Sequence, residues 1–164
     1  MTSNQDITVR RARDEELERV VRLRWNWTVV DRQQTPEMDE ATFVDGAAAW
    51  ARDRSATHIP FAAVTAKGDV VGMAWLAKAE RVASTKGFDR WSGDLQSCYV
   101  MPEYRNRGIG GRLVRAVLDA ATEMGAEHVT VHTTAGSPAM YTRNGFRQNP
   151  RSLFADAAIT EVAD

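Results

Sequence analysis

The chain has 164 residues, 43% of them hydrophobic and 26% charged, and its 21 Lys and Arg against 22 Asp and Glu leave a formal net charge of −1. This composition predicts a single globular domain, residues 1–164, with a sizeable core, and it excludes a disordered chain. The near-zero charge argues against nucleic acid or an anionic membrane as the main partner, because such binding depends on a basic surplus. Any basic site must therefore be local.

The chain carries no sequence signal for a membrane or for export. Its longest apolar run, residues 70–77, is well short of the roughly 20 residues that span a bilayer, so it predicts a buried strand. Residues 1–6 have neither a basic start nor an apolar stretch, which favours a cytoplasmic location. The one cysteine, Cys98, cannot form an internal disulfide and is expected to be a small buried side chain rather than a catalytic thiol.

The N-terminal third predicts one strand followed by two helices. Residues 7–10 have the composition of a first strand. Apolar residues then recur at helical spacing over residues 14–30, and Asp14 is expected to cap this helix. A Thr-Pro pair at Pro36 is typical of a helix start and predicts a second helix over residues 35–50.

The middle of the chain changes to the pattern of strands. Two hydrophobic runs, residues 61–64 and 70–77, predict a hairpin, because a Lys-Gly-Asp turn joins them. Residues 84–93 predict a polar loop, and residues 95–100 predict the next strand.

The C-terminal part predicts alternating helices and strands. Residues 108–124 form an amphipathic helix, and the strand at residues 129–131 is expected to be parallel to the one before that helix, because a helix crosses over between them. A short helix over residues 137–145 is followed by edge strands at Phe146 and at residues 153–154. The whole order predicts a mixed α/β domain with a central mixed sheet flanked by helices.

The segment most informative about chemistry is residues 100–112, which read as a strand, a glycine-rich turn and a helix start. The unpaired N–H groups of a first helical turn, together with the positive end of the helix dipole, form an anion site that suits phosphate. A cluster of arginines without an intervening acid surrounds this turn and matches a polyphosphorylated ligand: Arg105, Arg107, Arg112 and Arg115.

Other interpretations of the turn are weaker. A nucleotide-binding P-loop needs Lys and then Ser or Thr after its second glycine, whereas Gly111 and Arg112 follow Gly110 here. A dinucleotide-binding turn needs a third small residue where the chain has Leu113. A glycine-rich turn with ordinary surface arginines stays open.

Over residues 95–146 the chain resembles the GCN5-related N-acetyltransferases (GNAT). Their acetyl-CoA loop has the form Arg/Gln-x-x-Gly-x-Gly/Ala, and an aromatic-led Tyr-x-x-x-Gly-Phe motif follows downstream. The matching residues are Arg105, Gly108 and Gly110, with the lead-in Val100, Pro102 and Tyr104, and then Tyr141, Gly145 and Phe146. The resemblance implies a GNAT-like acyl-CoA N-acyltransferase fold. It also implies an acetyl-CoA-dependent N-acetyltransferase that transfers an acetyl group directly to a primary amine of a small molecule or peptide.

The resemblance further assigns roles to individual residues. Tyr141 is expected to stabilise the departing thiolate, as a hydrogen-bond donor more than as a full proton donor. Acetyl-CoA, the acyl donor, is expected to lie against the following residues: Cys98, Tyr99, Val100, Arg105, Arg107, Gly108, Ile109, Gly110, Gly111 and Arg112.

No metal site is expected. His128 and His132 have a spacing that resembles half of a zinc motif. On a strand, however, four residues span about 13 Å, which is too far for one ion.

Two departures from the family leave alternatives open. Thr134 stands where many relatives carry Asn, and the glutamate that some place on the strand before the loop as general base is missing. Asp94, Ser97 and His132 are the candidates for the base. The missing glutamate supports the alternative of a non-catalytic acyl-CoA-binding or regulatory module. Relatives are often dimers, so a homodimer is possible.

The acceptor side is expected to be formed by the two early helices and the loop before the strand at residues 95–100. Aromatic and acidic side chains in these segments would suit a small cationic amine through cation–π contact and charge pairing, although no acceptor is assigned. These residues are Trp25, Trp27, Trp50 and Trp91, with Asp31, Glu37, Asp39 and Asp94.

Overall fold

A computed structural model of the chain describes residues 6–134 and 136–157, and its centre is one five-stranded sheet in the order β1-β2-β3-β4-β5. Neighbouring strands are antiparallel except β4 and β5, which are parallel. The predicted mixed α/β fold with a central sheet is confirmed. The strands are β1 (Thr8–Arg11), β2 (His58–Val64), β3 (Val70–Arg81), β4 (Arg90–Val100) and β5 (Val129–Val131).

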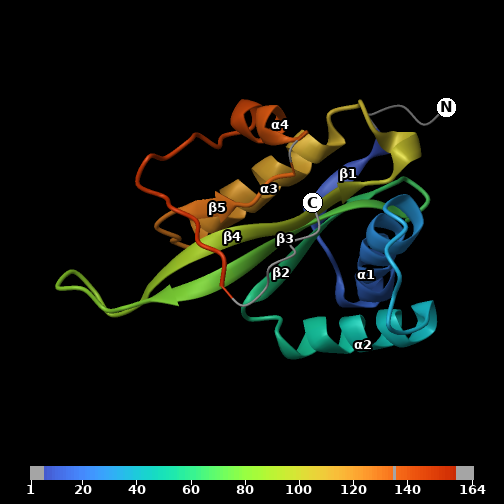
Figure 1. Ribbon diagram of the computed structural model, residues 1–164, viewed down its shortest axis with the longest axis horizontal. Helices are drawn as coiled ribbons and strands as arrows, with labels where there is room; N and C mark the ends of the chain where they lie inside the picture. Colours follow the sequence, from blue (N-terminus) through green and yellow to red (C-terminus); the bar gives the residue numbers. More distant parts are fainter. Residues whose placement is uncertain (1–5, 135, 158–164) are drawn as a thin grey trace.

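Helices cover both faces of the sheet (Figure 1). On one face α1 (Leu17–Trp25) and α2 (Glu40–Asp53) pack through a buried cluster that includes Met73 of β3. On the other face α3 (Ile109–Glu123) packs on the sheet through a second cluster that includes Leu95 of β4, and α4 (Pro138–Arg143) lies beside α3. The sheet therefore separates two cores. No helix in the described residues is both long and apolar enough to cross a membrane.

The first predicted helix differs from the structure at both ends. Asp14 does not cap it, because a short 3-10 turn (Asp14–Glu16) comes first, and in this turn Glu16 accepts a hydrogen bond from the Arg13 N–H at 2.8 Å. The Asp14 carboxylate instead accepts from Arg52 on α2 at 3.2 Å. At the other end α1 stops at Trp25 and continues as a π-helix, η3 (Asn26–Asp31).

The second helix begins at Glu40 rather than near Pro36. The reason is a specific cap, because the side chain of Asp39 accepts a hydrogen bond from the Thr42 N–H at 2.8 Å. The Thr-Pro pair therefore belongs to the connection before α2.

The prediction of a polar loop over residues 84–93 is wrong in its second half. β4 begins at Arg90, which pairs with Arg81 of β3. Trp91 explains the difference. Its ring is buried, and the Lys78 ammonium of β3 lies 4.5 Å from the ring centroid. The β3–β4 hairpin consequently projects as a long arm beyond the body of the domain (Figure 1).

The C-terminal predictions hold for α3, β5 and α4 but not for the edge strands. Gly108 precedes α3 with φ 77°, and Gly125 follows it with φ 86°. Residues 146 and 153–154 are not in strands, and Leu153 is 92% exposed. Within the described residues β5 is three residues long and pairs only with β4, so it offers these segments little to pair with.

Candidate active site

Strand β4 continues beyond the three residues over which it pairs with β5. The last parallel pair is Leu95 with Val131, whereas β4 continues to Val100. The backbone groups of β4 beyond Leu95 that face β5 therefore have no strand partner there. Beside residues 98–100, β4 therefore has a backbone edge that does not pair with β5.

A β-bulge lies in β4 at the same level. On the β3 side, Trp75 pairs with Gln96 and Met73 pairs with Tyr99, so two residues, Ser97 and Cys98, stand opposite one. Ser97 has φ 56°, in the left-handed region that non-glycine residues rarely adopt. Bulges often redirect side chains near active sites.

A cavity of about 350 Å³ occupies this region. It is bounded by η3 and the residue after it, by the second half of β4, and by β5 with the segment that leads into α4. Its lining residues are Trp27, Arg32, Leu95, Ser97, Cys98, Tyr99, Val100, Arg105, Val131, His132, Thr134, Ser137 and Tyr141. Four of the predicted site residues, Cys98, Tyr99, Val100 and Arg105, thus line one cavity with Tyr141.

Tyr141 and Cys98 form a hydrogen-bonded pair in this cavity. Tyr141 is 7% exposed, its ring stands edge-on to Phe146 with centroids 5.7 Å apart, and its hydroxyl donates to the Cys98 sulfur. Cys98 is only partly buried, not fully buried as expected, but desolvation of its sulfur raises the pKa of the thiol to about 12, although the Tyr141 hydrogen bond acts in the opposite direction. Burial, followed by the neighbouring Cys98, also raises the pKa of the Tyr141 hydroxyl.

These shifts limit the chemistry that the pair can perform. A thiol with a pKa of about 12 is almost entirely protonated at neutral pH, so Cys98 is a poor nucleophile. Tyr141 keeps its proton and remains a hydrogen-bond donor. The pair therefore suits stabilisation of a negative charge in the cavity rather than formation of a covalent enzyme intermediate.

Tyr99 and Arg105 connect the end of β4 to η3. The Tyr99 hydroxyl donates to Asp31 Oδ2 at 2.6 Å, and Arg105 Nη2 lies 3.3 Å from the same oxygen. Arg105 Nε also donates to the Val100 carbonyl at 2.8 Å. Burial and the Asp31 carboxylate raise the pKa of Tyr99. This cluster holds the wall of the cavity in place.

The turn before α3 has the backbone of an anion site. Asn106 and Gly108 have φ 62° and 77°, and no side chain caps the first turn of α3 in the described structure. A Cβ on Gly108 would have no atom within 4 Å, and one on Gly110 would meet only Val100 Cγ2 at 3.9 Å. The backbone beside these two residues is therefore open, as an anion site formed by the N–H groups of the helix start would require.

The other predicted residues of the turn have partners inside the protein. Arg112 donates to the Ile7 carbonyl at 2.8 Å, and Ile109 is buried in the core. A Cβ on Gly111 would lie 2.8 Å from the side chain of Asn144, so this glycine is required for packing against the end of α4.

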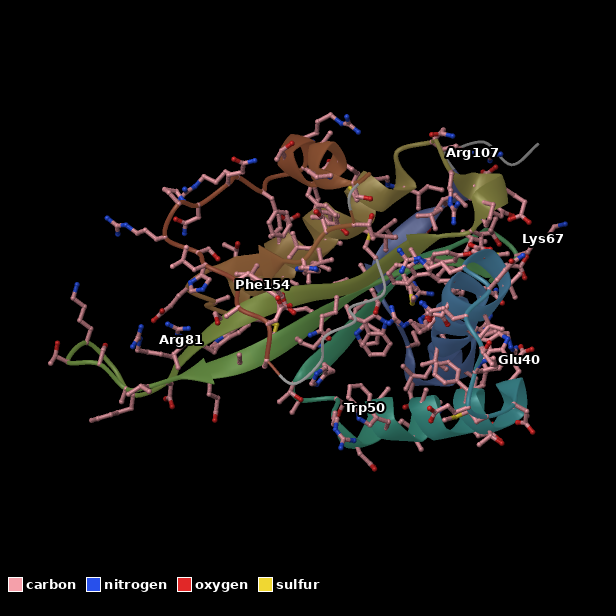
Figure 2. All side chains as sticks on the ribbon, in the orientation of Figure 1. Glu40, Trp50, Lys67, Arg81, Arg107 and Phe154 are labelled. Carbon is pink, nitrogen blue, oxygen red and sulfur yellow. The ribbon has the colours of Figure 1, made fainter. Side chains whose placement is uncertain are left out.

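The arginine cluster is therefore less concentrated than the sequence indicates. Arg107 Nη2 donates to the Glu103 carbonyl at 3.2 Å, and its side chain lies on the outer surface at the turn before α3 (Figure 2). Arg115 Nε donates to Asn144 at 3.0 Å. Arg105 is the member of the cluster that lines the cavity.

Among the four tryptophans expected at the acceptor side, the one that reaches the cavity is Trp27. Trp25 packs on Phe43, with ring centroids 5.9 Å apart, and Trp91 is buried against Lys78. Trp50 lies on the outside of α2, away from the turn that carries Arg107 (Figure 2).

The four acids do not form the expected cationic-amine site. Asp31 pairs with Tyr99 and Arg105, and Asp39 caps α2. Asp94 accepts hydrogen bonds from Gln96 and Thr130. No Asp or Glu occurs among the described residues that line the cavity.

Of the candidates for the base, Ser97 and His132 line the cavity, whereas Asp94 does not. Thr134 also lines it, and its hydroxyl lies 3.0 Å from that of Ser137. Sequence reasoning missed Arg32, which no motif marks. No group of three or more His, Cys, Asp or Glu that could hold a metal ion is found in the part of the chain that the structure describes.

Known structures share this architecture. A predicted acetyltransferase from Clostridium acetobutylicum, solved with acetyl-CoA, superposes with a TM-score of 0.72 at 14% identity, over 92% of this chain and 96% of that one. Glucosamine-6-phosphate N-acetyltransferase from Arabidopsis thaliana superposes with a TM-score of 0.69 at 12% identity, over 92% and 97%. An acetyltransferase from Trypanosoma brucei gives 0.68 at 21% identity, over 93% and 100%.

Two further comparisons use the sequence rather than the fold. No curated protein matches the chain. The family model described as "Acetyltransferase (GNAT) family" matches residues 15–146, which include α1, the bulge in β4, the turn before α3 and Tyr141. The chain therefore belongs to the GNAT acetyltransferase family.

Proposed function

We propose that the chain is an acetyl-CoA-dependent N-acetyltransferase that transfers an acetyl group directly to a primary amine of a small molecule or peptide. The observation that carries the proposal is the Tyr141–Cys98 pair, placed beside the separated edge of β4 in the cavity. The alternative, a non-catalytic acyl-CoA-binding module, has no need of a buried hydroxyl that can donate a hydrogen bond to a developing negative charge.

Two parts of the chain would hold acetyl-CoA, the start of α3 and the second half of β4. The N–H groups at the start of α3, beside the open space at Gly108 and Gly110, would hold the pyrophosphate. The backbone of Cys98, Tyr99 and Val100 would pair with the pantetheine amides, because β4 has lost its β5 partner there. Both parts would position the thioester near Tyr141.

Acetyl-CoA supplies the thioester carbonyl, whose carbon bonds to the amine nitrogen as the C–S bond breaks. Tyr141 would turn its O–H away from the Cys98 sulfur and donate the hydrogen bond to the departing sulfur instead. Because its pKa is raised while a thiol titrates near about 8.5, the tyrosine keeps its proton, and the thiolate takes one from solvent. A single well-placed donor of this kind contributes roughly 10²–10³ in rate.

The attacking amine must lose a proton. Ser97 and His132 are the candidates that line the cavity, and the proton would pass to solvent by way of one of them or through water.

The test combines binding and turnover. Millimolar acetyl-CoA is expected to raise the melting temperature, and a panel of amines, amino acids and peptides is expected to yield at least one acceptor that releases free thiol. Absence of a thermal shift would contradict the proposal. A shift without thiol release from any acceptor would favour the non-catalytic alternative.

A further inference from the structure

Most of the side chains that line the cavity cannot take a proton from the attacking amine. No Asp or Glu lines it among the described residues. Its two lining arginines stay protonated, as arginines do in proteins. The Cys98 thiol and the hydroxyls of Tyr99 and Tyr141 have raised pKa values, so they keep their own protons at neutral pH. The base must therefore be sought among the remaining lining residues.

His132 is the lining side chain whose chemistry suits a base. A histidine ordinarily titrates between pH 5 and 8, so a neutral imidazole accepts a proton far more readily than a hydroxyl does. The lining hydroxyls also have partners. Ser97 accepts a hydrogen bond from Arg24 at 3.2 Å, and the hydroxyls of Thr134 and Ser137 lie 3.0 Å apart. These contacts leave His132 as the best proton acceptor in the described lining of the cavity.

His132 lies where a proton can be both accepted and released. It follows Val131, the last residue of β5, which pairs with Leu95 at the end of the β4–β5 ladder. His132 therefore stands at the level where β4 no longer has a β5 partner, and it lines the cavity there. Its side chain is also exposed to solvent. A proton taken up from the cavity can consequently pass from the ring to water.

The C-terminal segment contacts this exposed ring. After α4 the chain loops away and returns toward the sheet (Figure 1), with a turn in which the Asn149 side chain accepts from the Arg151 N–H at 3.0 Å. Phe154, labelled in Figure 2, lies on the returning part. Its ring centroid is 5.5 Å from that of His132, with the ring planes 32° apart. Aromatic pairs at this separation prefer particular relative orientations, so the contact limits those of the His132 ring.

The exposure of Phe154 shows that burial in a core does not explain its position. The side chain is 69% exposed, and it belongs to neither of the two buried clusters. Its described ring contact is the one with His132. The placement of Phe154 is therefore better explained by the site than by the packing of the domain.

We infer that His132 accepts the proton from the attacking amine and that Phe154 is a positioning residue that holds the imidazole ring for this transfer. The inference rests on the proposed acetyltransferase function and identifies its base. The nitrogen of a neutral amine bonds to the thioester carbonyl carbon and becomes positively charged. A ring nitrogen of His132 takes one proton from it as the C–S bond breaks, and later releases that proton to solvent. The departing thiolate takes a proton from solvent, so protons balance overall.

The first experiment replaces the histidine. Thiol release is measured at saturating acetyl-CoA, with the panel amine that the unsubstituted protein uses best. His132→Ala is expected to lower kcat about a hundredfold, while KM for the amine changes less than threefold and the thermal shift given by acetyl-CoA is kept. His128→Ala is the matched control, because His128 is an exposed histidine just before β5 that does not line the cavity. It should retain kcat within twofold.

Added imidazole distinguishes loss of a base from loss of packing. It is expected to raise kcat of His132→Ala at least about tenfold, because it supplies a base where the side chain has been removed. It should not raise kcat of Tyr141→Phe, which lacks a hydrogen-bond donor instead. A His132→Ala protein with kcat within threefold of the parent would overturn the inference, as would a loss of kcat that imidazole does not restore.

The second experiment removes the positioning contact. Phe154→Ala is expected to lower kcat about tenfold with little change in KM, because the base is no longer held in one orientation. Phe154→Tyr keeps an aromatic ring and should retain at least half of kcat. Phe88→Ala is the matched control, since Phe88 is 86% exposed in the turn between β3 and β4 and does not line the cavity.

A double variant tests whether Phe154 acts through His132. In the His132→Ala background, Phe154→Ala is expected to lower kcat no further, because the ring that it positions is absent. An equal further loss of kcat in that background would mean that Phe154 has a general structural role, and would overturn its part of the inference.

The outcomes separate the inference from the function on which it rests. If acetyl-CoA does not stabilise the unsubstituted protein, the proposed function itself fails. If acetyl-CoA binds but no amine of the panel is acetylated, the non-catalytic alternative is favoured and the inference fails with the turnover that it explains. If an amine is acetylated and His132→Ala retains kcat, the inference alone is wrong and the proposed function stands.

Discussion

The two halves of β4 belong to one strand but differ in pairing and in backbone conformation. Over residues 90–95 the strand pairs with β3 throughout and with β5 from Gly93 to Leu95, and most of its side chains are buried. Over residues 96–100 it has a bulge, a left-handed residue at Ser97 and no β5 partner. The first half is scaffold and the second half faces the cavity, so the loss of one strand partner leaves a backbone edge unpaired with β5 beside the cavity.

Close packing explains why the first half stays paired. A Cβ on Gly93 would lie 2.8 Å from Leu76 Cδ1 and 3.3 Å from Val129 Cγ2, so β3, β4 and β5 meet there with no room for a side chain. Beyond Leu95, Tyr141 of α4 lines the cavity, and its hydroxyl donates a hydrogen bond to the Cys98 sulfur. The closely packed part of β4 therefore ends where the part that lines the cavity begins.

The largest expected effect concerns Cys98, the one cysteine of the chain. Because its pKa is raised to about 12 against about 8.5 for a free thiol, a disulfide reagent at pH 7.5 should label the native protein at least about a hundredfold more slowly than the unfolded one, since the loss of thiolate outweighs the greater reactivity of a more basic thiolate. The native rate should keep rising with pH up to at least 10. Native labelling within tenfold of the unfolded rate would contradict the raised pKa of this partly buried thiol.

Loss of the Tyr141 hydroxyl is expected to come next. Tyr141→Phe should lower kcat about a hundredfold, because the donor to the departing thiolate is lost, and should change the Kd for acetyl-CoA less than threefold. Tyr104→Phe is the control, since the Tyr104 ring contacts Arg107 and its hydroxyl does not line the cavity. Equal effects of the two substitutions on kcat would remove Tyr141 from the reaction.

In the first half of β4, Gly93→Ala tests packing rather than chemistry. The new methyl group would press on Leu76 and Val129, so we expect the free energy of unfolding to fall by about 1–3 kcal/mol in denaturant titrations. Gly46→Ala in α2 is the control, because nothing lies within 4 Å of its Cβ position, and it should stabilise by about 0.5–1 kcal/mol. A Gly93→Ala protein as stable as the parent would show that the sheet is looser there.

The smallest effect is expected at the bulge. Ser97→Gly removes the cost of φ 56° for a non-glycine residue and also the hydrogen bond from Arg24, so the unfolding free energy should change by less than about 1 kcal/mol. Ser97→Val should destabilise by about 1–2 kcal/mol, since a β-branched residue resists this backbone conformation. Equal stability of the two variants would mean that the bulge relaxes on substitution.

Much of the fold is predictable from the sequence because its signals are local. The amphipathic pattern and the flanking glycines define α3, and the crossover makes β4 and β5 parallel. The predictions failed where distant contacts decide, as in the start of β4, which depends on burial of Trp91 against Lys78 of β3. The prediction of where α2 starts failed for another reason. Two start signals compete, the Thr-Pro pair at Pro36 and Asp39, and Asp39 forms the cap.

The candidate site is predictable only in part. Motifs indicate Tyr141 and the turn at Gly108, because both need specific residue types at fixed spacing. They do not indicate Arg32, which lines the cavity directly after a π-helical turn that no motif marks. The hydrogen bond between Tyr141 and Cys98 joins α4 to β4. It depends on the tertiary structure, so no local sequence pattern could predict it.

Amide hydrogen exchange with and without acetyl-CoA tests most directly the claim that the second half of β4 is the binding edge. The account predicts that acetyl-CoA slows exchange at the amides of residues 98–100 and 108–112 at least about tenfold, while the amides of residues 91–95 stay unchanged. Equal protection along the whole of β4, or protection confined to its first half, would contradict it.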